Sequence, residues 1–477
     1  MHLFYFRAPI RWATVVVACA LAPLCLYRQP APVAARRSNS RGEQAAHRVD
    51  VGPLRTVHVG QHPVLVAIDA RDRHIFVANE GPLAANRALP SGMGSVSMVD
   101  ERTGAVLRTV TVGQTPVAIA FDAPTGRVFV LTAGRIDTSA GFTSVGGSVS
   151  VLDAVTGALV RTLEVGPVPI TVSGSGAVPS ARQALAVDAT SGRVYVAAGD
   201  TILALDGSTG LIRQTLDLST GGPPQIPSPS TVVVSAQAQR LYVGDGYDAA
   251  LPPPATPLGS SGGSLAVLNN ATNRGVANVV LRQQGVRAIA VDERANRVLV
   301  FELPGDRTYP TVVEVLDART GTLLHTTQLQ QRRADGDCAI GVDRRTAQVF
   351  MLYTPSGYGN DATVGTVDIL DARSGRLLRT IALPTTSYQG YFLSRVVAVD
   401  DNDRRVVAAV SVGAFAGTIA AIYSSDVYVL DTRSGKILHS LKVGAGPQDV
   451  AIDEVARRVF ITNEHDNTLS VFDALRL

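Results

Sequence analysis

Short apolar stretches recur along this chain and are separated by polar turns of nearly constant length. Each unit begins with an apolar residue, Asp, four residues and Arg before an apolar run, as in residues 120 to 130. Its second half reads VSVLDAVTGALVRT, as in residues 149 to 162. Val-rich runs of this length between turn residues predict β-strands. In the second unit we expect strands at residues 116 to 122, 127 to 133, 148 to 153 and 159 to 165.

Two kinds of tight turn join these strands. DAPTGR (residues 122 to 127) joins the first strand to the second, and DAVTG (residues 153 to 157) joins the third to the fourth. Asp at the start of such a turn accepts hydrogen bonds from backbone N–H groups ahead of it, and Gly supplies the left-handed conformation. The Asp residues that open these turns are therefore predicted to be structural and not catalytic.

The number of repeats and the two chain ends together predict a closed ring. The first-half motif occurs eight times, and the chain ends at Leu477 without a fourth strand for the last unit. Residues 52 to 60 (GPLRTVHVG) resemble the fourth-strand segment at residues 104 to 113. We therefore predict an all-β fold, a β-propeller of eight four-stranded antiparallel blades with seven as the alternative, over residues 49 to 477. An N-terminal strand at residues 54 to 59 should complete the last blade beside residues 469 to 472.

The N-terminal segment has the features of an export signal. Arg7 and Arg11 precede an apolar run that extends from Trp12 to Tyr27. Residues 33 to 35 (VAA) offer a small-residue cleavage site. Residues 1 to 35 are predicted to be a signal peptide or an N-terminal membrane anchor, with lipidation at Cys19 as a further alternative. Residues 36 to 48 are predicted to be a disordered linker. The expected location is extracytoplasmic (secreted, periplasmic or cell-surface), with the N-terminal segment as the only contact with a membrane.

The charge balance argues against nucleic acid as a partner. The chain has 43 Lys and Arg against 40 Asp and Glu, but residues 1 to 48 hold seven Arg and one Glu. The predicted propeller therefore has 36 basic and 39 acidic residues. A body with this balance lacks the basic field that attracts a phosphate backbone.

Several segments resemble the YVTN family of β-propeller repeats. The resemblance is carried by VGQTPVAIAFD (residues 112 to 122) and SVSVLDAVTG (residues 148 to 157), while FVANE (76 to 80) and FITNE (460 to 464) come closest to the signature tetrapeptide. It implies an extracytoplasmic propeller but not one activity, because such families include envelope binding proteins and subunits of redox enzymes. Most units lack the signature Asn, and eight units are counted where familiar members have seven.

The long connections are predicted to gather on one face of the ring. In a four-stranded blade the two tight turns lie on one face, and the links between blades and the loops between the second and third strands lie on the other. Because long loops add little core, their segregation marks a functional surface. We call it the long-loop face, and its loops are expected at residues 79 to 94, 132 to 147, 244 to 263, 302 to 311, 353 to 365 and 411 to 425.

Candidate ligand-binding residues occur at two places on this face. The first is the junction of units one and eight, with two carboxylates and two imidazoles in adjacent loops that could bind a divalent cation or a polar ligand. The alternative is that the Asn residues cap loop backbone and the others are solvated. The second is a mixed-charge link whose alternative is a solvated turn. The residues are His62, Asn79, Glu80, Asn463, Glu464, His465 and Asp466 at the junction, and Arg332, Arg333 and Asp337 in the link.

These features favour a binding protein over an enzyme. The sequence contains no CxxCH haem motif and no HExxH zinc motif, and its only Trp lies in the N-terminal apolar run. We expect a non-catalytic binding or scaffold protein whose long-loop face binds a protein, a glycan or a small ligand, with no catalytic residues and no cofactor, although a divalent cation is a candidate ligand. The alternative is a propeller enzyme, either a metal-assisted lyase or lactonase or the heavy subunit of a redox complex.

Overall fold

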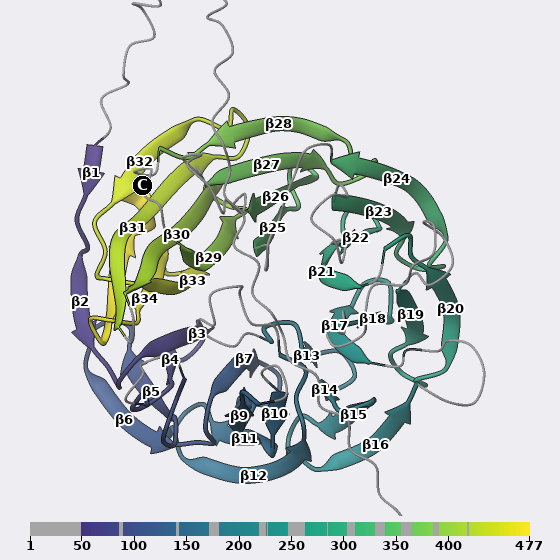
Figure 1. The fold of residues 1–477 in the computed structure, drawn as a ribbon, viewed down its shortest axis with the longest axis horizontal. Coiled ribbons are helices and arrows are strands. Elements are labelled where there is room, and N and C mark those ends of the chain that lie inside the picture. Colours follow the sequence, from purple (N-terminus) through teal and green to yellow (C-terminus); the bar gives the residue numbers. More distant parts are fainter. Residues whose placement is uncertain are drawn as a thin grey trace, which may run out of the picture. The chain divides into compact units, whose positions relative to one another are not determined.

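The part of the chain described here is a ring of antiparallel sheets (Figure 1). The computed structural model describes residues 49 to 477 except 85–88, 140–142, 171–180, 219–225, 227, 247–262, 284, 303–310, 330–338, 354–364, 385–390 and 417–418. The predictions for residues 1 to 48 therefore lie outside the described residues. Residues Arg48–Leu477 form one compact unit.

Eight sheets follow one another around the ring, as the number of repeats predicts. We number them blades 1 to 8 in chain order, each running from the inner strand to the outer strand. Blades 1 to 4 consist of β3 (Pro63–Asp69), β4 (His74–Asn79), β5 (Ser95–Asp100) and β6 (Val106–Thr111); β7 (Pro116–Asp122), β8 (Arg127–Thr132), β11 (Gly147–Asp153) and β12 (Leu159–Gly166); β13 (Leu185–Asp188), β14 (Arg193–Ala198), β15 (Thr201–Asp206) and β16 (Ile212–Asp217); and β17 (Pro229–Ser235), β18 (Arg240–Asp245), β19 (Ser264–Asn269) and β20 (Gly275–Val280).

The second half of the ring repeats the same order and contains the chain ends. Blades 5 to 8 consist of β21 (Val286–Asp292), β22 (Arg297–Glu302), β23 (Thr311–Asp317) and β24 (Leu323–Leu329); β25 (Ala339–Asp343), β26 (Gln348–Tyr353), β27 (Thr366–Asp371) and β28 (Leu377–Ala382); β29 (Tyr391–Asp400), β30 (Arg405–Ala416), β31 (Ile419–Asp431) and β32 (Ile437–Leu441); and β33 (Pro447–Asp453), β34 (Arg458–Asn463), β35 (Thr468–Asp473) and β2 (Arg55–His58).

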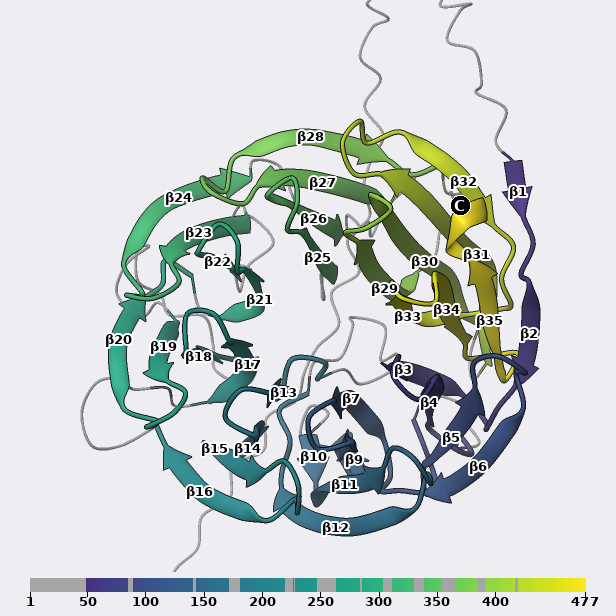
Figure 2. The ribbon, with the colours of Figure 1, turned by 180° about the vertical axis from the view of Figure 1, so that it is seen from behind.

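The N-terminal strand completes the last blade, which confirms the predicted closure. β2 pairs antiparallel with β35, with Val57 opposite Leu469, and Leu54 N donates to Val471 O at 2.8 Å. The chain also forms a strand that the repeat pattern does not predict. β1 (Val49–Val51) pairs in parallel with β32, so it covers the outer edge of blade 7. Both views down the ring axis show β1 and β2 running along the outside of the last two blades (Figures 1 and 2).

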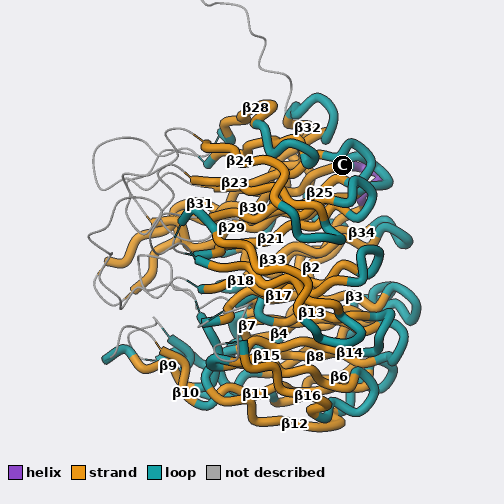
Figure 3. The backbone as a smooth tube through the Cα atoms, turned by 90° about the vertical axis from the view of Figure 1, so that its right-hand side faces the viewer, coloured by secondary structure: helices purple, strands orange, loops and turns teal. Residues whose placement is uncertain are grey.

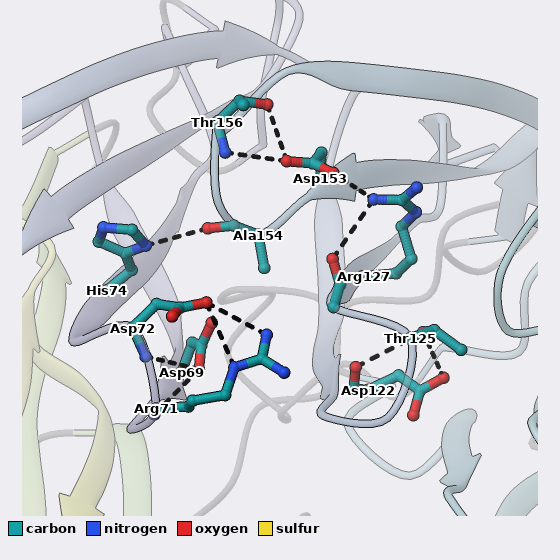
Figure 4. A network of polar contacts seen from close by, with 11 residues as sticks. Asp69, Arg71, Asp72, His74, Asp122, Thr125, Arg127, Asp153, Ala154 and Thr156 are labelled. Atoms are coloured by element: carbon teal, nitrogen blue, oxygen red, sulfur yellow. Dashed lines mark hydrogen bonds and ion pairs between the residues drawn. The ribbon is translucent and has the colours of Figure 1, made fainter.

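The repeated Asp and Arg residues stabilise the tight turns, as predicted for the Asp residues (Figure 4). Asp153 Oδ1 accepts hydrogen bonds from Thr156 N at 2.9 Å and Thr156 Oγ1 at 2.8 Å. Arg127, the motif Arg of the same blade, forms an ion pair with Asp153 and donates from Nε to Ser208 O of the next blade at 3.3 Å. The motif spacing thus positions an Arg that joins two turns of its own blade and reaches the neighbouring one.

Apolar side chains fill the space between neighbouring blades. The second and third strands are almost completely buried, whereas fourth strands such as β6 and β12 are mostly exposed. One cluster joins Phe129 and Val149 of blade 2 to Val194 and Leu203 of blade 3. Each blade therefore buries both faces against its neighbours, which explains the near-continuous Val-rich runs in the sequence.

The tight turns lie on one side of the strands, and extended connections project on the other (Figure 3). Two connections predicted as irregular loops contain strands instead. Residues 132 to 147 include a hairpin of β9 (Arg135–Asp137) and β10 (Thr143–Val145). At residues 411 to 425, β30 and β31 continue as one long hairpin in place of the predicted loop. The prediction of loops was wrong there because strand pairing continues beyond the blade. Most of residues 244 to 263, 302 to 311 and 353 to 365 lies outside the described residues.

A short segment before β13 crosses the middle of the ring. β13 has four residues, whereas the inner strands β3, β7, β17, β21 and β33 have seven. Arg182 reaches blade 8, where Nη1 contacts Asp449 Oδ1 at 2.5 Å and Nη2 donates to Gln448 O at 2.6 Å. The Gln183 amide exchanges two hydrogen bonds of 2.9 Å with the backbone of Ile289 in blade 5. We call residues 181 to 184 the strap, because they connect three blades that are not adjacent.

Among the described residues, the only helix is the single turn η1 (Ala474–Arg476). Within that part of the chain, no helix has the length and apolar character needed to cross a membrane.

Replacing Val57 by Asp tests the closing strand. The Val57 side chain is 5% exposed and packs with apolar residues of blades 1 and 8, so a carboxylate there should lower the free energy of unfolding by about 3–5 kcal/mol. The adjacent His58 is exposed, and His58→Asp should change that free energy by less than about 0.5 kcal/mol. Urea denaturation of both variants measures the difference. Equal stability of the two variants would contradict the burial of β2 in the last blade.

Replacing Gln183 by Ala tests the strap. The substitution removes both hydrogen bonds to Ile289, and we expect a loss of about 1–3 kcal/mol in the free energy of unfolding. Gln61→Ala, the same change at an exposed position in the link before β3, is the matched control and should have an effect below about 0.5 kcal/mol. A Gln183→Ala protein as stable as this control would show that the strap contributes nothing to the ring.

Candidate functional site

The candidate residues of blades 1 and 8 are held by the same local backbone arrangement. His62 lies in the link before β3, Glu80 directly follows β4, and Glu464 directly follows β34. In blade 1, Glu80 N donates to His62 O at 2.9 Å, and in blade 8, Glu464 N donates to Gly446 O at 2.8 Å. The link that enters each blade is therefore tied to the end of that blade's second strand, on the long-loop face.

His62 has a left-handed backbone for a structural reason. Its φ is 55°, a conformation that non-glycine residues rarely adopt and that is often associated with functional sites. Thr115 in blade 2 and Gly446 in blade 8 occupy the equivalent position before a Pro and have φ values of 58° and 71°. Because three blades share this geometry, the conformation belongs to the repeat and positions the imidazole without indicating a function.

Glu464 lies between the two candidate imidazoles. His62 Nδ1 is 3.9 Å from Glu464 Oε1, and His465 Nδ1 is 3.6 Å from Glu464 Oε2. The two imidazole rings meet edge to face, with centroids 6.5 Å apart. The Glu464 side chain is 6% exposed, whereas those of His62 and His465 are 25% and 29% exposed. Solvent therefore reaches the imidazoles far more readily than the carboxylate between them.

Glu80 brings a second carboxyl group to the same place. Glu80 is 1% exposed, and its Oε1 has no hydrogen-bond partner in the part of the chain that the structure describes. Burial, and then the nearby charge of Glu464, raises the pKa of Glu80 well above its usual value. Glu80 therefore holds its proton to higher pH than an exposed glutamate does.

Asn79 and Asn463 connect the second strand of their blade to the third. Asn79 Nδ2 donates to Ser95 Oγ and Ser97 Oγ, both at 3.2 Å. Asn463 Nδ2 donates to Thr468 Oγ1 and Ser470 Oγ, both at 2.9 Å. Both Asn side chains are fully buried, so their amide groups serve the fold and do not face a ligand.

Asp466 and the neighbouring Asn467 bind backbone groups of the links. Asp466 Oδ2 accepts a hydrogen bond from Ala445 N at 2.6 Å, and Asn467 Oδ1 accepts one from His62 N at 2.8 Å. Asn467 thereby connects the loop of blade 8 to the link of blade 1. The other candidate set, Arg332, Arg333 and Asp337, lies outside the described residues.

Two further residues complete this region, Gln448 and Asp449, and neither was predicted from the sequence. Gln448 is buried and donates through Nε2 to Glu464 Oε2, and Asp449 Oδ2 accepts from Val66 N at 2.9 Å. Their signal was present in the repeat. The inner strands of blades 1 and 2 begin PVLV and PVAI, whereas that of blade 8 begins PQDV, with two polar residues where the others have apolar ones.

The contacts of this junction bear on which cations it could bind. Across the described residues, no three or more His, Cys, Asp and Glu side chains are grouped so that they could hold a metal ion. At this junction Glu464 Oε2 already accepts from Gln448, and its two oxygens face the two imidazoles. Two buried carboxyl groups beside partly exposed imidazoles can receive one ammonium or guanidinium group.

Comparison with solved structures shows the propeller fold, and no family model and no curated protein matches the sequence. BamB from Moraxella catarrhalis is similar with a TM-score of 0.50 and 12% identity, over 88% of this chain and 98% of that chain. Hydrazine synthase from Kuenenia stuttgartiensis has a TM-score of 0.51 and 13% identity, over 76% and 97%. The dihydro-heme d1 dehydrogenase NirN, in complex with DHE, has a TM-score of 0.55 and 13% identity, over 88% and 76%. At these identities the similarity shows the fold alone, and the eight blades follow from the strand order of this chain.

Proposed function

We propose that this protein is a non-catalytic, extracytoplasmic binding or scaffold propeller that receives a cationic group of its ligand at the junction of blades 8 and 1. The observation that carries the proposal is the Glu464 carboxylate held between His62 and His465, with the buried Glu80 beside it. The ligand is a protein side chain, an amino sugar of a glycan or a small molecule with an amine or guanidinium group.

The position of this cluster supports a binding role. It lies where the blade assembled from both ends of the chain meets blade 1, on the face opposite the tight turns. Rigid strands on both sides fix the carboxyl groups before a ligand arrives, and a preorganised site avoids the cost of ordering side chains on binding. A cation that enters would favour loss of the proton from the buried pair, so binding should strengthen as pH rises.

The extracytoplasmic location rests on the N-terminal sequence. The apolar run after Arg7 and Arg11 is typical of an export signal, and the repeats resemble those of YVTN propellers. The three structural neighbours include a dehydrogenase and a synthase. One fold supports many functions, so the binding proposal rests on the site and not on these neighbours.

A triple variant tests the binding site. Glu80→Gln, Glu464→Gln and His62→Gln together remove the charge but keep side chains of similar size, so the protein should remain folded by circular dichroism. Calorimetric titration with arginine amide and with glucosamine should show binding to the wild type that is weakened at least about tenfold in the triple variant. Asp72→Asn, on the tight-turn face, is the control and should bind like the wild type. Failure of the wild type to bind either probe, or equal binding by the triple variant, would contradict the proposal.

The raised pKa of Glu80 predicts a pH-dependent effect on stability. Below the pKa of the unfolded state, about 4.3, Glu80 is protonated in both states and contributes no difference. As pH rises above that value, the unfolded state loses its proton first, so the folded state becomes progressively less stable until the raised folded pKa is passed. Glu80→Gln removes this loss, so its free energy of unfolding should exceed that of the wild type by a margin that grows between pH 4.5 and 7.5. A margin that stays constant in urea denaturation at the two pH values would show that the carboxyl is not buried as described.

A further inference from the structure

Blade 5 differs from blades 1 and 8 at one pair of positions. In blades 1 and 8, a hydrogen bond joins the last residue of the second strand to the residue diagonally opposite it on the third strand. An amide donates to a hydroxyl in both blades, at 3.2 Å in blade 1 and 2.9 Å in blade 8. In blade 5 both positions hold a glutamate. The pairs are Asn79 with Ser97 in blade 1, Asn463 with Ser470 in blade 8, and Glu302 with Glu314 in blade 5.

The strand register places the two glutamates on the same face of blade 5. Glu314 lies opposite Val300, and Glu302 lies opposite Val312, which is the register that blades 1 and 8 show for their Asn and Ser residues. Residues directly opposite each other on paired strands lie on the same face of the sheet, and so do residues two positions apart along one strand. The apolar residues on this face, including Val300, pack against blade 4. The two carboxyl groups therefore meet between blades 4 and 5.

Both carboxyl groups are buried, and few hydrogen bonds reach them. Glu302 and Glu314 are 0% and 1% exposed. Gln283 N donates to Glu302 Oε2 at 2.6 Å, but Glu302 Oε1 and both oxygens of Glu314 have no hydrogen-bond partner among the described residues. In blades 1 and 8 an amide donor faces a hydroxyl, whereas here two acceptors face each other. Such a pair requires a proton or a cation between its members, because two adjacent buried carboxylates repel each other and lose their hydration.

The protein's own charges only partly compensate this pair. Burial, followed by the charge of Glu314, raises the pKa of Glu302 to about 8, and burial raises the pKa of Glu314 to about 7. The positive charge of Arg282 acts in the opposite direction. The Arg282 side chain is exposed, so solvent screens its charge. Within the described part of the chain, three of the four carboxyl oxygens accept no hydrogen bond.

We propose that Glu302 and Glu314 form a divalent-cation site between blades 4 and 5, with Ca²⁺ as the preferred ion. Ca²⁺ takes oxygen ligands from monodentate and bidentate carboxylates in flexible geometry and completes its coordination with water or carbonyl oxygens. The absence of nitrogen and sulfur donors from the pair disfavours zinc and copper. The site is separate from the junction of blades 8 and 1, so the outcome of its test does not depend on the proposed function.

A double variant that copies the pair from blades 1 and 8 tests the site. Glu302→Asn with Glu314→Ser restores an arrangement that this chain already contains twice, so the variant should fold. The matched control is Asp368→Ser, which removes an acid at the position of blade 6 equivalent to Glu314. The full-length protein, treated with EDTA, is titrated with Ca²⁺, Mg²⁺ and Mn²⁺ separately up to about 10 mM, a range that covers weak extracellular sites. Bound metal is measured by equilibrium dialysis and elemental analysis, and Tm is measured in parallel.

We expect the wild type and Asp368→Ser to bind one Ca²⁺ per chain with an increase in Tm, and the double variant to show neither. If the double variant does not fold, Glu314→Gln serves in its place and should weaken Ca²⁺ binding at least about tenfold through loss of one ligand charge. Three results would overturn the proposal: no cation bound by the wild type, undiminished binding by the folded variant, or a wild-type Tm that responds to pH between about 7 and 9 but not to Ca²⁺.

Discussion

The pairing of β2 with β35 is the interaction on which the rest of this structure depends. Each blade buries its faces on two neighbours, so an open row of blades would leave an apolar face uncovered at each end. The four residue pairs between Arg55–His58 and Thr468–Val471 convert that row into a ring, because they build the last blade from both ends of the chain. The candidate ligand site lies at this closure and exists only when the ring is shut.

The strap adds a second constraint across the ring. Arg182 contacts Asp449 and the carbonyl of Gln448, while the Gln448 side chain contacts Glu464. The candidate site is therefore supported from the closing blade and from a segment of blade 3. A site held in two ways can keep its carboxyl groups buried and close together, an arrangement that a flexible loop would relax. The raised pKa of the buried Glu80 is consistent with that rigidity.

Sequence periodicity predicted most of the fold because one local rule is repeated many times. The Asp that opens a tight turn, such as Asp153, and the Val-rich runs around it predict the ends of the strands to within one or two residues. The segment at residues 54 to 59 predicted the closure of the ring. The pattern failed where the structure departs from the repeat. The extended hairpin of β30 and β31 and the strap each depend on contacts between residues far apart in sequence, for which a local motif contains no signal.

The candidate site was predictable in part for the same reason. His62, Glu80, Glu464 and His465 stood out as polar residues near the predicted closure, and the structure brings them together. Gln448 was overlooked, although it replaces an apolar residue of the inner strand. Asn79 and Asn463 were candidates as well, but their side chains connect the second and third strands of their blades. The glutamates of blade 5 had no signal until the strand register showed that Glu302 and Glu314 occupy positions where other blades pair an amide with a hydroxyl.

Hydrogen exchange of the backbone amides of β2 tests the closure most directly. If β2 is an integral strand of blade 8, peptides that cover residues 54 to 59 should exchange as slowly as peptides from β35, through the same cooperative opening. Exchange of these amides within seconds, at the rate of an unpaired chain terminus while β34 and β35 remain protected, would show that the ring is not closed by its N-terminal strand.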